Sequence, residues 1–338
     1  MTAEDVASKL PLDLVTGGAG FLGSAIVREV LAAGRRARVL ALPDEKLDNL
    51  AGLDVEVARG DVRNRSDCEA AVAGCSRVYH AAAVYRDYMP DPTPLYEVNM
   101  RGTFNMLEAS RRAGVEHVVY TASVVALGRP KPGELGDEDT AYEAWDIDFP
   151  YSRSKYHSRR LAEDFSTWGM DVRVVCPGMI FGPGDVGPTP SGQLILNVAH
   201  GKAPGWTEGG CGYVDVRDAA QVHVLASEKG RAGRRYLAVG HNLHNRDFLS
   251  TVSRIAGRSH RMPKIPTQVA RLYLKGMAKF ALIRGDTPMM TSEMFDYSCR
   301  PVFFNNRRSQ DELGMIYRPI TETISDAIAY FREVGQIG

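Results

Sequence analysis

The sequence has no excess of charge of either sign. Its 338 residues carry 41 basic and 41 acidic side chains, so the formal net charge at neutral pH is zero. A chain that is drawn to nucleic acid or to an anionic membrane by long-range attraction usually has a basic surplus. We therefore expect a small molecule as the partner, and no nucleic acid.

Cysteine is scarce and follows no pattern. Neither the cysteines nor the eight histidines show the spacing of a metal site or of a redox centre. We predict reduced thiols and no bound metal. The five cysteines are Cys68, Cys75, Cys176, Cys211 and Cys299.

Long apolar runs are also missing. No segment reaches the roughly 18 uninterrupted apolar residues of a membrane span, so no stable membrane insertion is expected. The first eleven residues are polar, which predicts a loose tail rather than a signal peptide and a cytoplasmic location. The cationic and apolar segment 267–285 is a helix candidate, for which packing against the rest of the chain is favoured over contact with a membrane. Its Arg271, Lys275 and Lys279 are interpreted as a solvated basic face.

Short β-rich runs alternate with helical patterns in the first half of the chain. Apolar residues recur at helical spacing in segments 21–34 and 95–114. Regular alternation of strand and helix is typical of a parallel sheet covered on both faces, so we predict an α/β, doubly wound fold. The expected strands are 12–16, 37–42, 54–60, 77–83, 117–123 and 172–177.

The alternation of strand and helix patterns ends at about residue 178, and glycine- and proline-rich loops and irregular helices follow. Segment 213–226 nevertheless has the pattern of a strand that returns into the sheet and is followed by a helix. We predict a dinucleotide-binding part over 12–178, with a return segment at about 211–230. A smaller, interleaved substrate-binding part would occupy most of 179–335.

A glycine cluster follows the first expected strand. In LVTGGAGFLGS, Gly17, Gly20 and Gly23 stand between that strand and the next helix. Glycine allows a sharp turn there and a close approach of the backbone to a pyrophosphate, which the free N–H groups of the helix would face. This strand-loop-helix context predicts a dinucleotide site.

Other parts of that site are less specific. Asp61 follows the third strand and could hold the adenine amino group, or merely shape a helical turn, while the small residues 81–83 would let a flat cofactor lie against the backbone. The second strand ends in Ala41-Leu42-Pro43, which offers neither a carboxylate for a ribose nor an arginine for a 2′-phosphate. The choice between NAD and NADP therefore stays open.

A serine, a tyrosine and a lysine form the candidate catalytic group. Ser123 ends the fifth strand, Tyr151 follows 28 residues later, and Lys155 lies one helical turn beyond it on the same face. A phenol has a pKa of about 10, and lowering it by about 3 units takes about 4 kcal/mol, which a nearby cation in a partly dry site can supply. Tyr151 could then exchange a proton with an alcohol or carbonyl while the Ser123 hydroxyl holds the same oxygen.

These motifs resemble those of the extended short-chain dehydrogenases/reductases. The likeness covers about residues 12–335 and includes VNMRGT, YTAS, YSRSK, CPGMIFGPGD, YVDVRDAA and DELGMIYRP. Segments 80–103 and 182–204 are similar to the hopanoid-associated sugar epimerases, a group close to the dihydroflavonol 4-reductases. The chain departs from the family pattern at Ala122, often a serine, and at Leu42, often a basic residue.

The resemblance implies a Rossmann fold, a catalytic Ser123, Tyr151 and Lys155, and Asn99 as support for a water-linked proton path. It also implies that Pro177 and the following turn shape the nicotinamide pocket. Candidate substrate contacts are Tyr85, Ser123, Trp145 and Met179. The expected cofactor contacts are Gly17, Gly20, Phe21, Leu22, Gly23, Leu42, Asp61, Val62, Ala81, Ala82, Ala83, Tyr151, Lys155, Pro177, Met179 and Ile180.

Three functions fit these observations. The favoured one is an NAD(P)-dependent oxidoreductase that acts on a secondary alcohol or ketone of a fairly hydrophobic molecule. A nucleotide-sugar epimerase or dehydratase would use the same residues but retain its NAD, and a non-enzymatic dinucleotide sensor would not need Tyr151. Similar proteins are usually homodimers, which pair through two helices flanking the active-site strands.

Overall fold

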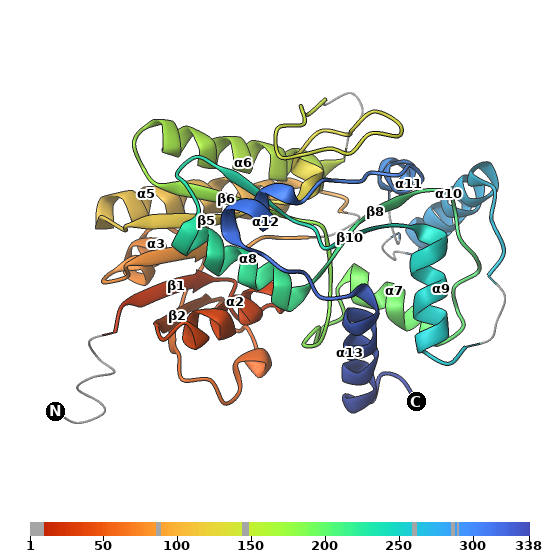
Figure 1. Cartoon of the computed structure of the whole chain (residues 1–338), viewed down its shortest axis with the longest axis horizontal. Helices are drawn as coiled ribbons and strands as arrows, with labels where there is room; N and C mark the ends of the chain where they lie inside the picture. Colours follow the sequence, from red (N-terminus) through yellow and green to blue (C-terminus); the bar gives the residue numbers. More distant parts are fainter. Residues whose placement is uncertain (1–9, 86–88, 144–148, 259–261, 285–287, 289–290) are drawn as a thin grey trace.

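In the part of the chain that the structure describes, seven parallel strands form the central sheet (Figure 1). This computed structural model describes residues 10–85, 89–143, 149–258, 262–284, 288 and 291–338. The strand order is β3-β2-β1-β4-β5-β6-β9, so the order reverses between β1 and β4, where open α/β sheets bind their ligands. The strands are β1 Leu12–Thr16, β2 Arg36–Ala41, β3 Glu56–Arg59, β4 Arg77–His80, β5 His117–Thr121, β6 Val172–Pro177 and β9 Arg235–Ala238.

Helices cover both faces of this sheet because its strands are apolar on both sides. Every residue of β1 and of β5 is buried. One face packs against α3 Arg65–Val72, α5 Thr103–Ala113 and α6 Pro150–Thr167, and the other against α2 Phe21–Ala32, α8 Val216–Lys229 and α12 Arg307–Leu313. The predicted doubly wound Rossmann fold is confirmed.

A smaller sheet lies beside the carboxyl end of the central one. It has the order β10-β8-β7, formed by β7 Met179–Phe181, β8 Gly210–Asp215 and β10 His241–His244. Its apolar residues share a separate core with α7 Pro190–Ala199, α9 Asn245–Ile255 and α13 Ile320–Glu333. The assignment of substrate binding to 179–335 stays a prediction.

The strand predicted within 213–226 does not return into the central sheet. It is β8, which belongs to the smaller sheet, and only the following helix, α8, returns to pack against α2. The free edge of β6 is filled instead by β9, a strand of four residues that the sequence pattern did not indicate.

The helix predicted over 95–114 is interrupted. A short α4, Thr93–Tyr96, runs into a π-helical stretch at Glu97–Gly102 before α5 begins. Single π-turns within helices are rare and often lie at functional sites, and this one contains Asn99.

The cationic segment predicted as a helix over 267–285 is α10, Thr267–Arg284. Its expected packing is one-sided: α10 contacts α11, Ser292–Ser298, and Arg271 pairs with Asp296 at 2.7 Å, yet none of its residues is buried. Among the described helices, none combines the length and the apolar character required to cross a bilayer.

Candidate active site

The glycine loop lies between β1 and α2 with its backbone close to the end of β4. Gly17 has a φ of +68°, and a Cβ atom added there would lie 2.9 Å from the Cα of Ala82. A Cβ atom on Gly23 would lie 2.0 Å from the Gly17 carbonyl oxygen. Side chains at either position would therefore displace the loop. The first turn of α2 carries no acidic residue, so its N–H groups suit a pyrophosphate and the cradle fits a dinucleotide.

A buried chain of hydrogen bonds holds the end of β4 in place. The Ala82 N–H donates to the Thr16 hydroxyl at 3.1 Å, and the Thr16 hydroxyl lies 2.7 Å from His80 Nδ1. On the other side, His80 Nε2 lies 3.1 Å from the Thr103 hydroxyl, which donates to the Asn99 carbonyl at 2.7 Å. Because each hydroxyl has one proton to give, Nδ1 accepts and Nε2 donates.

His80 therefore does more than pack against the core at the end of its strand. Burial lowers the pKa of His80 to about 3, so the ring is neutral, as this directed chain requires. The imidazole ties β1 and β4, at the floor of the dinucleotide site, to Thr103 at the start of α5 and through it to Asn99 in the π-helical stretch. Sequence reasoning missed this role because the threonine partners lie 64 and 23 residues away.

We expect His80→Leu to weaken both the fold and dinucleotide binding. The substitution removes one hydrogen-bond partner from each of two buried hydroxyls, the acceptor of the Thr16 proton and the donor to the Thr103 oxygen, at a cost of about 1–3 kcal/mol each. The unfolding free energy and the dissociation constant for NAD measure the two effects. His80→Gln, which keeps one donor and one acceptor, serves as the control and should lose much less. Equal losses in both variants would show that only ring packing matters.

The edge of the site at β2 holds two opposite charges. Leu42 is exposed at the end of the strand, and its N–H donates to the Glu45 carboxylate at 3.0 Å. Arg59, from the neighbouring β3, donates to the Leu42 carbonyl at 2.8 Å. Sequence reasoning weighed only residues that follow β2, so Arg59 was missed.

The side chain of Asp61 is already engaged. Its carboxylate pairs with Arg63 at 2.6 Å, and that contact holds the pKa of Asp61 below its usual range. The adjoining Val62 is buried and packs against Gly102, where an added Cβ atom would lie 2.6 Å from Val62 Cγ2. The carboxylate of Asp61 is thus part of an ion pair, and its contact with an adenine stays a prediction.

Helix α6 brings Tyr151 and Lys155 to the carboxyl end of β5. Phe149 and Pro150 start the helix, with Pro150 at a first-turn position that needs no N–H donor. The inner face of α6 is lined with small, fully buried serines that let it approach the sheet closely. Ser152 donates to the Val125 carbonyl at 2.8 Å and so ties α6 to the turn that follows Ser123.

Lys155 is a buried cation. Its side chain is almost fully buried, and its Nζ atom donates to the Thr121 carbonyl, at the end of β5, at 2.9 Å. No carboxylate pairs with it within the described residues. Burial lowers the pKa of Lys155 to about 8. An ammonium group with no counter-ion is suited to stabilising an anion that forms beside it.

Asn99 holds the site together rather than leaving its amide open. Its Oδ1 accepts from the Val84 N–H at 2.8 Å, and its Nδ2 donates to the Val84 carbonyl at 3.1 Å and to the Ser154 hydroxyl at 3.0 Å. Asn99 thereby joins the segment after β4 to α6, one residue before Lys155. This geometry supports a positioning role, and its part in a proton path stays a prediction.

The predicted substrate contacts fall in different places. The ring centroids of Tyr85 and Tyr151 lie 4.7 Å apart, and Ser123 is half-buried at the start of the turn after β5. Met179 begins β7 two residues after the buried Pro177 and packs partly into the second core. Trp145 lies outside the described residues.

The remaining cofactor candidates follow β1 or β4 of the central sheet, except for Ile180 in β7 of the smaller sheet. They are half-buried or exposed at the start of α2, after β4 and in β7, where a flat molecule could lie against them. These residues are Gly20, Phe21, Leu22, Ala81, Ala82, Ala83 and Ile180.

Comparison with known proteins gives a consistent result. The family described as NAD dependent epimerase/dehydratase matches residues 14–240. A putative dihydroflavonol 4-reductase from Synechocystis sp. is 30% identical, over 96% of this chain and 95% of its own length. Sterol demethylase protein B from Methylococcus capsulatus is 33% identical, over 96% and 99% respectively.

Solved structures share the whole fold. The crystal structure of gox2253 is 34% identical, has a TM-score of 0.87, and covers 97% of this chain and 99% of its own. A nucleoside-diphosphate-sugar epimerase from Pseudomonas aeruginosa is 24% identical with a TM-score of 0.81, over 97% and 99%, and indicates the fold alone.

Proposed function

Because this chain belongs to the NAD-dependent epimerase/dehydratase family of extended short-chain dehydrogenases/reductases, we propose that it reduces a ketone, or oxidises the corresponding secondary alcohol, of a fairly hydrophobic small molecule. It is an NAD-dependent enzyme by family, and relatives along its whole length are named as reductases, so a sensor without activity is not proposed further. The observation that carries the proposal is the buried Lys155, without a carboxylate partner in the described residues, one turn from Tyr151.

The proposed chemistry assigns a task to each side chain. A bound nicotinamide supplies or accepts the hydride. Tyr151 donates a proton to the carbonyl oxygen in reduction, and the Ser123 hydroxyl holds that oxygen. The Lys155 ammonium stabilises the phenolate that remains on Tyr151. Asn99 keeps α6 and the segment after β4 at a fixed distance, so that Tyr85 and Tyr151 stay in contact.

Ion pairs in the second half occupy several of the cations that a sugar nucleotide would need. A diphosphate needs several cationic groups that converge on it and are free to bind. Six arginines of this half are instead neutralised by carboxylates in the described structure. These are Arg217, Arg234, Arg235, Arg271, Arg308 and Arg318. The aromatic contact between Tyr85 and Tyr151 also favours an apolar, flat substrate.

A screen of substrates tests the proposal. Ketones, aldehydes and sugar nucleotides are supplied with NADH or NADPH, and the loss of reduced nicotinamide is followed by absorbance. We expect turnover with a hydrophobic ketone. Conversion of a sugar nucleotide on a cofactor that stays bound through purification would instead support the epimerase alternative.

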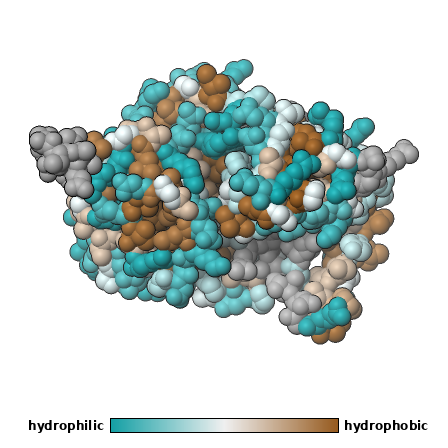
Figure 2. Space-filling view, turned by 90° about the horizontal axis from the view of Figure 1, so that it is seen from below, coloured by the Kyte–Doolittle hydropathy of each residue, from teal (hydrophilic) through white to brown (hydrophobic). Residues whose placement is uncertain are grey.

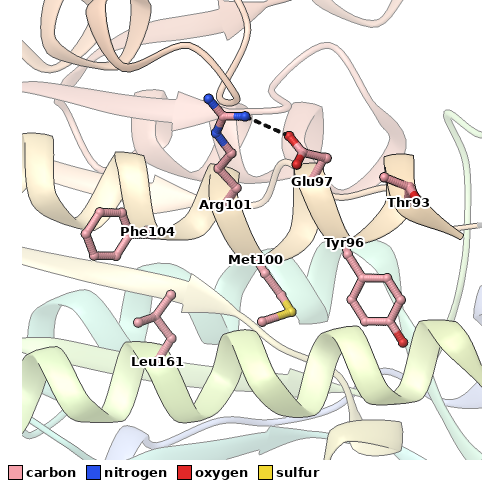
Figure 3. A pocket seen from close by; sticks show the side chains of 7 residues that line it. All are labelled: Thr93, Tyr96, Glu97, Met100, Arg101, Phe104 and Leu161. Carbon is pink, nitrogen blue, oxygen red and sulfur yellow. Dashed lines mark hydrogen bonds and ion pairs between the residues drawn. The ribbon is translucent and has the colours of Figure 1, made fainter.

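We propose that a second copy of this chain binds to the surface that runs from α4 through the π-helical stretch to α5. Figure 3 shows a groove on this side, where Met100 and Leu161 point toward each other between the π-helical stretch and α6. Its lining is mostly apolar and includes Phe104, which is 45% exposed. Two antiparallel copies would bury this surface as an isologous interface.

We expect Phe104→Glu to shift the protein from dimer to monomer, because the charge would be buried in the paired interface. Light scattering after gel filtration measures the mass. Val334, which is also 45% exposed but lies after α13, provides the control variant Val334→Glu. A wild-type monomer, or a dimer that survives Phe104→Glu, would refute this interface.

A further inference from the structure

The outer face of α10 is apolar along its whole length. The residues of this helix that are most exposed include Leu272 at 74% and Ile283 at 84%. Figure 2 shows hydrophobic surface on the projecting part of the end where Figure 1 places α10 and α11. Isolated exposed apolar residues are common on proteins, but an unbroken apolar stripe is not.

Helical geometry separates this helix into distinct faces. With about 100° per residue, the partly covered positions 267, 270, 274, 278 and 281 form one stripe, which points toward the rest of the protein. The opposite stripe contains apolar side chains and Gly276, and Arg284 projects from it near its Met277 border. Its members are Val269, Leu272, Tyr273, Gly276, Met277, Phe280 and Ile283.

Cations flank the apolar stripe, and α10 contains no acidic residue. Lys275 and Lys279 lie along one border and Arg284 along the other, whereas Arg271 is already paired with Asp296. Within the described residues, neither lysine makes an ion pair. An apolar face with basic borders is the pattern of a helix that lies in the plane of an anionic membrane surface.

The other occupants fit this surface less well. A second copy of α10, related by a two-fold axis, would bring both sets of cations together without any carboxylate on the helix to balance them. A small molecule binds in a concave site, whereas α10 presents a convex ridge. Tyr273 also suits the interface between lipid and water, because its ring is apolar and its hydroxyl is polar.

The helix is connected to the candidate active site through α11. Tyr297 of α11 packs against Phe149, with ring centroids 5.7 Å apart, and Phe149 is the N-cap residue that immediately precedes α6. A bilayer surface at α10 would therefore be linked to the start of α6 through one intervening helix, α11.

We propose that α10 docks the protein reversibly on the surface of an anionic phospholipid bilayer. The apolar stripe enters the headgroup region, and Lys275, Lys279 and Arg284 contact the lipid phosphates. This proposal is independent of the reaction, because it rests on the exposed residues of α10 alone. If the oxidoreductase function holds as well, docking brings the site to substrates that are dissolved in the membrane.

Sedimentation with vesicles tests the docking without any activity measurement. The full chain is mixed with vesicles of phosphatidylcholine alone or with about one third phosphatidylglycerol. We expect binding to the anionic vesicles, at least about tenfold weaker binding to the neutral ones, and release when salt is raised from about 0.1 M to 0.5 M. Leu272→Glu with Phe280→Glu should abolish binding, and Lys275→Gln with Lys279→Gln should weaken it to the level of neutral vesicles.

Matched control variants distinguish vesicle binding by this surface from nonspecific binding. Ile316→Glu changes an apolar residue outside α10 that is 85% exposed. Lys131→Gln with Lys202→Gln removes two exposed cations outside α10. Both control proteins should bind vesicles like the wild type. Absence of wild-type binding, or equal loss in the control variants, would overturn the proposal. The proposal would also be overturned if the protein bound no vesicles but associated with itself, and if Leu272→Glu with Phe280→Glu abolished that self-association. A second copy of the chain would then occupy this surface.

Discussion

Replacing Tyr151 by phenylalanine is expected to lower turnover by about 10³-fold while dinucleotide binding stays nearly unchanged. The phenol hydroxyl is the proposed proton donor, and positioned acid-base groups contribute typically 10²–10⁴-fold. The ring itself remains, so its contact with Tyr85 and the packing of α6 are retained. Steady-state rates with a ketone, together with titration of the cofactor, measure the two quantities.

The same helix offers a control tyrosine. Tyr156 is five residues further on in α6 and stacks on Tyr142, with ring centroids 4.1 Å apart, away from the Tyr85 contact. We expect Tyr156→Phe to keep most of the activity. A Tyr151→Phe enzyme that retains more than about a tenth of the wild-type rate would remove this tyrosine from the proposed chemistry.

Replacing Lys155 by methionine is expected to abolish turnover and yet stabilise the protein. The ammonium is buried at the Thr121 carbonyl, and its burial lowers the pKa of Lys155 from 10.5 to about 8. A shift of this size corresponds to a cost to the folded state of about 3 kcal/mol while the lysine is charged. Methionine fills a similar volume without that cost.

The pH dependence of unfolding gives the sign of this effect. Below about pH 8 the lysine is charged in both states and the full cost is present. Between about 8 and 10.5 the unfolded chain holds more protons, so the contribution of Lys155 to stability rises with pH. Denaturant unfolding of both proteins across this range isolates the contribution, because other groups titrate alike in each. If the Lys155→Met protein were less stable than the wild type at pH 7, contacts in the folded state would offset the cost of burying the ammonium group.

The local parts of the site could be predicted from the sequence. The boundaries of β1 and β6 agree with the predicted strands, because each is a continuous apolar run bounded by turns. The glycine loop and the start of α6 at Pro150 follow from local backbone requirements, so they could be placed without knowledge of the rest of the chain.

The features that were missed depend on contacts between distant segments. The four residues of β9 are too few for their pattern to show which sheet edge they will fill. The pattern of β8 likewise does not show that its partners are β7 and β10 in the smaller sheet. His80 acquires its role only when β1 and the π-helical stretch are brought beside it. Arg59 reaches the end of β2 because parallel pairing places β3 there, 17 residues later in the chain.

The stoichiometry of nicotinamide and product tests the central claim most directly. The enzyme is supplied with a hydrophobic ketone and an excess of NADH or NADPH, and both the oxidised nicotinamide and the alcohol are measured until the reaction stops. The proposed chemistry predicts one oxidised nicotinamide for each alcohol formed, over many turnovers per enzyme. Product that accumulates while the nicotinamide remains bound and shows no net change would contradict it.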